Sequence, residues 1–204
     1  MAPSAAETRT TDARSRLQLI VAGGVGLAAA SPILRALLGT GAADAASKSE
    51  DLRILQLVLL LEYTQVALYE RAINEASLTG ALRDFAQIAL GHERQHLAAV
   101  KQALGSKAGP KPRFEFGLKT KSADAFRETA IKLEDIAVAG YNGQATNLTK
   151  PTLAVAAEIV SVEARHAAWV RAIADEVAAP DPVDEPMTAS EVAAGLREIG
   201  LRTS

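Results

Sequence analysis

Two motifs of the form Glu-x-x-His are the part of this chain best suited to chemistry. One pairs Glu93 with His96, the other pairs Glu163 with His166, and together they use two of only three histidines in the sequence. On a helix, residues three positions apart share a face, so each motif would direct a carboxylate and an imidazole the same way. Carboxylate oxygen and imidazole nitrogen suit iron, manganese or zinc. Two such motifs therefore predict a metal site.

A further glutamate and a tyrosine precede each motif in the same order. Tyr69 follows Glu62 by seven residues, and Tyr141 follows Glu134 by seven residues. Dimetal carboxylate bundles use one glutamate from each of two helices and one Glu-x-x-His from each of the other two, all directed inward. The doubled pattern therefore predicts a set of six metal ligands. They are Glu62, Glu93, His96, Glu134, Glu163 and His166.

The charge of this set also favours bound cations. Glu62 falls in the middle of an apolar helical stripe, where an isolated carboxylate would cost several kcal/mol to bury. Four carboxylates at one level repel one another unless they are protonated or bind metal. We therefore predict two divalent ions, with iron favoured and manganese or zinc as alternatives. The competing interpretation is an inert bundle that merely inherited a polar core.

The two tyrosines are the candidate catalytic residues that do not bind metal themselves. On helices, Tyr69 and Tyr141 would lie two turns from Glu62 and Glu134. A buried tyrosine commonly packs in the core with its hydroxyl hydrogen-bonded. A sharper role is a hydrogen bond to a carboxylate across the bundle, or a radical relay. We favour packing combined with hydrogen bonding.

A different metal site is also encoded around the first motif. His92, Glu93 and His96 match the His-Glu-x-x-His pattern of zinc peptidases, in which two histidines hold zinc and the glutamate activates water. The Gly-x-x-His extension of one such class is missing, and the pattern does not explain the second Glu-x-x-His. We therefore expect His92 to face solvent or to contact a ligand.

The composition favours helices as the elements that position these residues. The chain has 204 residues, of which 49% are hydrophobic and 4% are aromatic, and alanine and leucine are abundant. The net charge of −2 gives no indication of a nucleic-acid partner. The absence of cysteine excludes disulfides, thiolate metal sites and cysteine catalysis.

Hydrophobic periodicity predicts an all-α four-helix bundle in residues 47–179, followed by a proline-rich tail and a short helix in 180–204. The glycines and prolines of 105–122 exclude a continuous helix there and suit a crossover between the second and third helices. The inward seam of the fourth helix would run from Val155 to Val177. The expected helices are 49–76, 79–104, 123–148, 149–178 and a short fifth at 188–199.

Residues 1–46 differ from the rest and have the pattern of an export signal. Arginines lead into an apolar run at 17–34, and Ala-Asp-Ala at 43–45 fits a cleavage site. We expect an exported protein, located in the periplasm or cell envelope or secreted. The segment also resembles a twin-arginine leader, although the adjacent arginine pair is missing. The alternatives are a disordered tail or an uncleaved anchor that associates with a membrane through 17–34.

With these residues in place, the chain resembles the ferritin-like superfamily, and more narrowly the bacterial ferritin-like domain family that includes desiccation-related proteins. The resemblance rests on the two Glu-to-Tyr segments, the two Glu-x-x-His motifs, the loop Arg113–Gly117 and the tail after Asp181. It implies an up-down-down-up bundle in which Glu62 and Glu134 are terminal ligands and Glu93 and Glu163 bridge two metals. His96 and His166 would complete one ion each. His92 departs from relatives, which commonly carry an acid there.

Three functions follow as hypotheses. The leading one is a ferroxidase-like oxidoreductase that binds two ferrous ions and reacts them with oxygen or peroxide in stress protection. The second is a non-catalytic desiccation or stress protein of the envelope, with a structural metal or none. The third is the zinc peptidase. A homo-oligomer is compatible with each of them.

Overall fold

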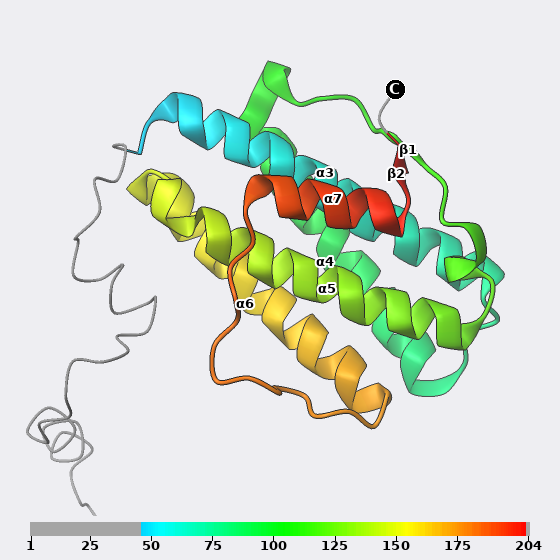
Figure 1. Cartoon of the computed structure of the whole chain (residues 1–204). Helices are drawn as coiled ribbons and strands as arrows, with labels where there is room; N and C mark the ends of the chain where they lie inside the picture. Colours follow the sequence, from blue (N-terminus) through cyan, green and yellow to red (C-terminus); the bar gives the residue numbers. More distant parts are fainter. Residues whose placement is uncertain (1–45, 203–204) are drawn as a thin grey trace, which may run out of the picture. The chain divides into compact units, whose positions relative to one another are not determined.

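The computed structural model describes residues 46–202, and the predicted export segment, residues 1–46, lies outside them except for its last residue. Four long helices form the bundle: α3 (Lys48–Glu75), α4 (Gly80–Leu104), α5 (Ala123–Gln144) and α6 (Lys150–Ile173). Helix α3 packs most closely against α4, and α5 packs most closely against α6. Followed along the chain, the helices run up, down, down and up, as predicted (Figure 1).

Local sequence signals explain where the helices begin and end. The side chain of Ser47 accepts a hydrogen bond from Glu50 N at the start of α3, and Ser122 accepts one from Ala125 N at the start of α5. Pro151 stands in the first turn of α6, where no backbone donor is needed. Gly105 ends α4 with a positive φ of 55°, a conformation that glycine adopts without steric cost.

The connection between α4 and α5 runs along the length of the bundle (Figure 1). It contains two 3₁₀ turns, η1 (Gly105–Lys107) and η2 (Gly117–Thr120), with strand β1 (Arg113–Phe114) between them. The ring of Phe116 is buried and fixes this connection to the bundle. Strand β1 also pairs antiparallel with β2 (Leu201–Arg202), so the crossover is held by the end of the chain as well.

Helix α7 (Ala189–Ile199) packs against α5 and α3. A capping box between Thr188 and Glu191 begins it. Glycines permit its close approach to α5: a Cβ on Gly140 would meet Val192 at 3.0 Å, and a Cβ on Gly195 would meet Ile136 at 2.7 Å. Gly140 therefore lies within helix α5 and does not end it. Helix α5 ends at Gln144, and the 3₁₀ turn η3 (Ala145–Asn147) replaces the last turn of the helix expected over 123–148. The buried face of α7 consists of Val192, Leu196 and Ile199.

Helix α6 is shorter than its hydrophobic pattern predicts. It ends at Ile173, where the chain turns through Asp175 at a φ of 58°. Val177 is therefore 69% exposed and does not continue the inward seam. Val155, at the other end of that seam, is 51% exposed. Both positions were predicted to face the core, and both predictions were wrong because α6 lies against its neighbours only along its middle.

Helix α3 has more buried residues than any other described helix and supplies much of the core. By length and composition it could cross a membrane, but 67% of its most apolar window is buried inside the bundle. A core helix buried on several sides is expected to be this apolar. The largest fully buried side chains among the described residues include Tyr69, Phe85, Phe116, Phe126, Leu59, Leu61, Leu68 and Leu133.

Candidate metal centre

The six candidate ligands converge at the middle of the bundle. One glutamate comes from α3, one from α5, and one Glu-x-x-His pair comes from each of α4 and α6. Their ligand atoms form two groups, and within each group the atoms lie within 4.8 Å of one another. The two groups share Glu93 and Glu163. The first is Glu62, Glu93, His96 and Glu163; the second is Glu93, Glu134, Glu163 and His166.

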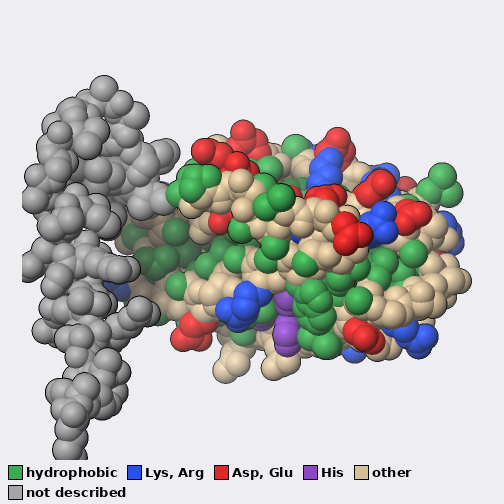
Figure 2. Space-filling model, turned by 90° about the horizontal axis from the view of Figure 1, so that it is seen from below, with side chains coloured by type: hydrophobic (Ala, Val, Ile, Leu, Met, Phe, Trp, Pro, Cys, Tyr) green, Lys and Arg blue, Asp and Glu red, His purple; other side chains and the backbone are tan. Residues whose placement is uncertain are grey.

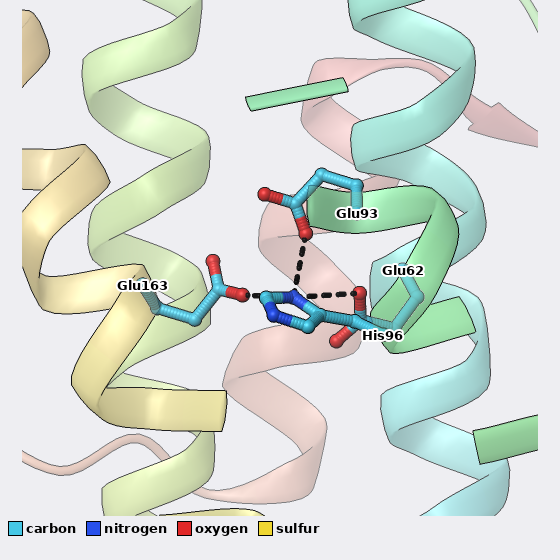
Figure 3. Close-up of side chains that lie close together, drawn as sticks. All are labelled: Glu62, Glu93, His96 and Glu163. Atoms are coloured by element: carbon cyan, nitrogen blue, oxygen red, sulfur yellow. Dashed lines mark hydrogen bonds and ion pairs between the residues drawn. The ribbon is translucent and has the colours of Figure 1, made fainter. Parts of the chain in front are cut away.

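An imidazole nitrogen stands at the centre of each group. His96 Nδ1 lies 2.9 Å from an oxygen of Glu163, 3.1 Å from one of Glu93 and 3.8 Å from one of Glu62. Figure 3 shows these three carboxylates directed at the ring of His96 from three different helices. His166 Nδ1 lies 2.9 Å from Glu93, 3.6 Å from Glu134 and 3.9 Å from Glu163. The two halves of the centre are therefore nearly equivalent.

Several atoms of the centre are buried without a hydrogen-bond partner among the described residues. They include Oε2 of Glu62, Oε1 of Glu93 and of Glu163, and Nδ1 of His166. A buried polar atom left without a partner costs about 1–3 kcal/mol. These atoms approach one another closely but without hydrogen-bond directionality, and one cation in each ligand group would satisfy them. Oxygen-rich sets with one nitrogen per ion suit iron or manganese.

In the absence of metal, protons would balance part of the charge of this centre. Burial and the charges of Glu163 and Glu93 raise the pKa of Glu62 well above its usual value. Burial and the charge of Glu93 do the same to the pKa of Glu163. Burial alone would lower the pKa of His96, but the carboxylates of Glu163 and Glu93 outweigh it and raise that pKa to about 10. Burial would also lower the pKa of His166, but the carboxylates of Glu134 and Glu93 outweigh this effect and raise the pKa to about 10.

Each of the two tyrosines hydrogen-bonds the glutamate of the opposite helix. Tyr141, on α5, donates a hydrogen bond of 2.6 Å to Oε1 of Glu62 on α3. Tyr69, on α3, donates one to Oε1 of Glu134 on α5. Burial and the charge of Glu134 raise the pKa of Tyr69 well above its usual value, and burial and Glu62 do so for the pKa of Tyr141. Both phenols therefore keep their protons and hold one carboxylate oxygen each.

Gln65 also contacts the centre, and the sequence analysis missed it. It is fully buried, and its Nε2 donates a hydrogen bond of 2.8 Å to Oε2 of Glu163. The same nitrogen lies 3.5 Å from both oxygens of Glu134. Gln65 follows Glu62 by three residues, so its position on the same helical face was the available signal.

His92 belongs to neither ligand group. Its Nδ1 lies 2.9 Å from Nε2 of His166, and the side chain is partly buried. The peptidase arrangement, with His92 and His96 on one zinc and Glu93 beside them, is therefore not formed. His92 was expected either to face solvent or to contact a ligand, and it contacts the candidate ligand His166.

An opening between α4 and α6 leads from solvent to the centre. It has a volume of about 440 Å³ and is bordered by the three histidines. Figure 2 shows histidine side chains reaching the surface on this face, beside basic and hydrophobic side chains. Small solutes can therefore approach the histidine side of the centre. The lining is His92, Gln95, His96, Val162, Arg165, His166 and Trp169.

The chain matches a known protein family. The model of the ferritin-like domain matches residues 50–176. This range contains the six candidate ligands, both tyrosines, Gln65 and His92, and it extends over nearly all of the four bundle helices. No curated protein gives a significant match.

Proposed function

The chain belongs to the ferritin-like domain family. We therefore propose that it is a dimetal carboxylate protein that binds two divalent ions, with iron as the favoured metal. The observation that carries this proposal is the pair of ligand groups that share Glu93 and Glu163. Those two glutamates would contact both ions. The remaining ligands would each contact one ion: Glu62 and His96 the first, Glu134 and His166 the second.

The chemistry we propose is the oxidation of ferrous iron. Two ferrous ions held side by side would each give one electron to oxygen or peroxide and become ferric. In this reaction ferrous iron is the substrate, and the opening between α4 and α6 provides a route for iron and oxidant. The four carboxylates would offset the charge of two cations at this buried site.

The surrounding side chains hold the ligands in place for this task. Tyr141 occupies one oxygen of Glu62 and leaves Oε2 of that carboxylate directed at the first ion position. Gln65 holds one oxygen of Glu163 in a comparable way. Partners of this kind orient metal ligands and commonly change metal affinity when they are replaced. The tyrosines would thus act through the glutamates they contact.

For the cell, we propose a protective role in which the protein removes ferrous iron or peroxide outside the cytoplasm. The export pattern of residues 1–46 supports the location, and the resemblance to desiccation-related proteins supports the role. The second candidate is a non-catalytic stress protein whose ions only stabilise the bundle. The high internal charge of the centre favours bound ions under both hypotheses.

An anaerobic titration with ferrous iron, followed by exposure to oxygen or peroxide, tests the proposal. We expect two ions per chain, then loss of the oxidant with an absorbance change of the iron. The matched control is Glu128→Ala, which removes an exposed glutamate of α5 and should behave as wild type. Bound iron without consumption of either oxidant would favour the stabilising role. Failure to bind any divalent ion would refute the dimetal proposal itself.

A further inference from the structure

A second cavity lies at the end of the bundle where α3 and α6 begin. Its volume is about 300 Å³, at the lower end of the range for small-molecule sites. All four bundle helices contribute to its wall, and the wall is mainly aliphatic. Small side chains on α4 and α6, Ala99, Ala103 and Ala156, leave this space open. None of the functions considered above uses it.

The inner end of this cavity lies beside the first ligand group. Val58, Val100 and Ile159 line the cavity, and each is four residues from one ligand of that group. Four residues correspond to about one helical turn, or about 5.4 Å along the axis. Tyr141 lines the cavity as well, and its hydroxyl bonds to Glu62. The ligands one turn away are Glu62, His96 and Glu163.

The outer end carries the charged groups of the cavity, Lys48 and Asp51. The carboxylate of Asp51 is already used at the start of α6. It accepts hydrogen bonds from the Thr149 backbone at 2.9 Å, from Thr149 Oγ1 at 2.5 Å and from Thr152 Oγ1 at 2.6 Å. Lys48 is exposed at the rim and forms no ion pair with any residue between 46 and 202. The rim therefore places the Lys48 ammonium group beside the hydrogen-bonded carboxylate of Asp51, in front of an apolar interior.

We propose that this cavity binds an unbranched carboxylic acid of medium chain length. The carboxylate lies at Lys48, and the alkyl chain extends along Ile54 and Val58 until its end reaches Tyr141. A molecule bound in this way has its apolar end next to the Glu62 half of the centre. Binding requires the cavity and the lysine but no metal, so it can be tested separately from the dimetal function.

The experiment is a calorimetric titration of the full, metal-free chain with hexanoate, octanoate and decanoate. Burial of each added methylene should strengthen binding about fourfold until the cavity is full. Ala156→Phe fills the cavity and should weaken decanoate binding at least tenfold. Ala157→Phe places the same side chain one residue along on the exposed side of α6 and should leave binding unchanged.

The charge is tested with Lys48→Ala against Lys107→Ala, which removes an exposed lysine that does not line the cavity. The first should weaken decanoate binding but not 1-decanol binding, and the second should change neither. Absence of saturable decanoate binding to the wild type, or equal binding by Ala156→Phe, would overturn the proposal. The proposal would also be overturned if the wild type formed a dimer that Ala156→Phe dissociates, because this face would then bind a second copy of the chain. Metal stoichiometry of the same variants, measured separately, reports on the dimetal centre alone.

Discussion

The Nδ1 atom of His92 lies 2.9 Å from the Nε2 atom of His166, and the two rings are parallel within 8°. The other nitrogen of His166 faces Glu93 and Glu134. A neutral imidazole that offers its Nδ1 lone pair to a metal carries its hydrogen on Nε2. With metal bound, that hydrogen would be donated to Nδ1 of His92, which would fix the orientation of His166 as outer partners do in metal sites.

Removal of the His92 ring should weaken metal binding without abolishing it. In His92→Ala we expect both ions to bind, with an affinity lower by about tenfold, because His166 loses its orienting partner. Competition with a chelator measures the affinity, and His92→Asn, which keeps an acceptor, should recover part of it. If His92→Ala lost its metal while Glu163→Ala kept it, the site would belong to His92, Glu93 and His96.

The shared glutamates should matter more for paired occupancy than the unshared ones. Glu93→Ala and Glu163→Ala each remove a ligand from both groups, so neither variant should hold two ions. Glu62→Ala removes a ligand from the first group only and should retain one ion. Elemental analysis after gel filtration gives the stoichiometry, with Glu128→Ala as the control. Two ions in Glu93→Ala would contradict the bridging arrangement.

Metal binding should release protons well above neutral pH. With pKa values of about 10, His96 and His166 are both charged at pH 8 in the metal-free protein. Two ions must then displace two imidazole protons, and any proton held by Glu62 or Glu163 adds to these. Apparent affinity should therefore rise with pH up to about 10. Titration calorimetry in buffers of different ionisation enthalpy counts the protons, and no release at pH 8 would refute the charge balance described above.

The stability of the metal-free protein should have the opposite pH dependence. The folded-state pKa values of His96 and His166, about 10, exceed the ordinary value of about 6.5. A raised pKa contributes stability that is fully present below about pH 6.5 and is lost as the pH rises through about 10. The melting temperature of the metal-free protein should thus fall between pH 7 and 10. Saturation with metal should remove this decline, because bound ions replace the protons and stabilise the folded state.

Loss of a tyrosine hydroxyl should destabilise the metal-free bundle. Tyr141→Phe leaves Oε1 of buried Glu62 without its donor, at an expected cost of about 1–3 kcal/mol in the free energy of unfolding. Tyr63→Phe is the matched control on α3, since the Tyr63 hydroxyl lies 3.5 Å from its acceptor, Gly109 O. Urea unfolding of both variants gives the difference. Equal stability of the two would show that the Tyr141 contact contributes little.

The sequence predicted the fold and the meeting of the six candidate ligands well, because both depend on helical periodicity. It did not identify Gln65, since a glutamine three residues from Glu62 has many ordinary roles on a buried face. It predicted inward positions for Val155 and Val177, because periodicity does not reveal where a neighbouring helix ends. The role of Gly140 depends on Val192 in a distant segment, so only the packed structure explains it.

Tyr69 on α3 hydrogen-bonds Glu134 on α5, and Tyr141 on α5 hydrogen-bonds Glu62 on α3, so the ligands of the centre have an approximate internal twofold symmetry. Helices α3 and α4 form one pair, and α5 and α6 form the other. Each pair supplies three of the four residues around one ion position, and the fourth residue is a glutamate from the other pair. A two-helix hairpin with this order of ligands therefore needs only a second copy of itself to complete both positions. The bundle therefore has the organisation expected of a duplicated hairpin, in which the connection between α4 and α5 would join the two copies.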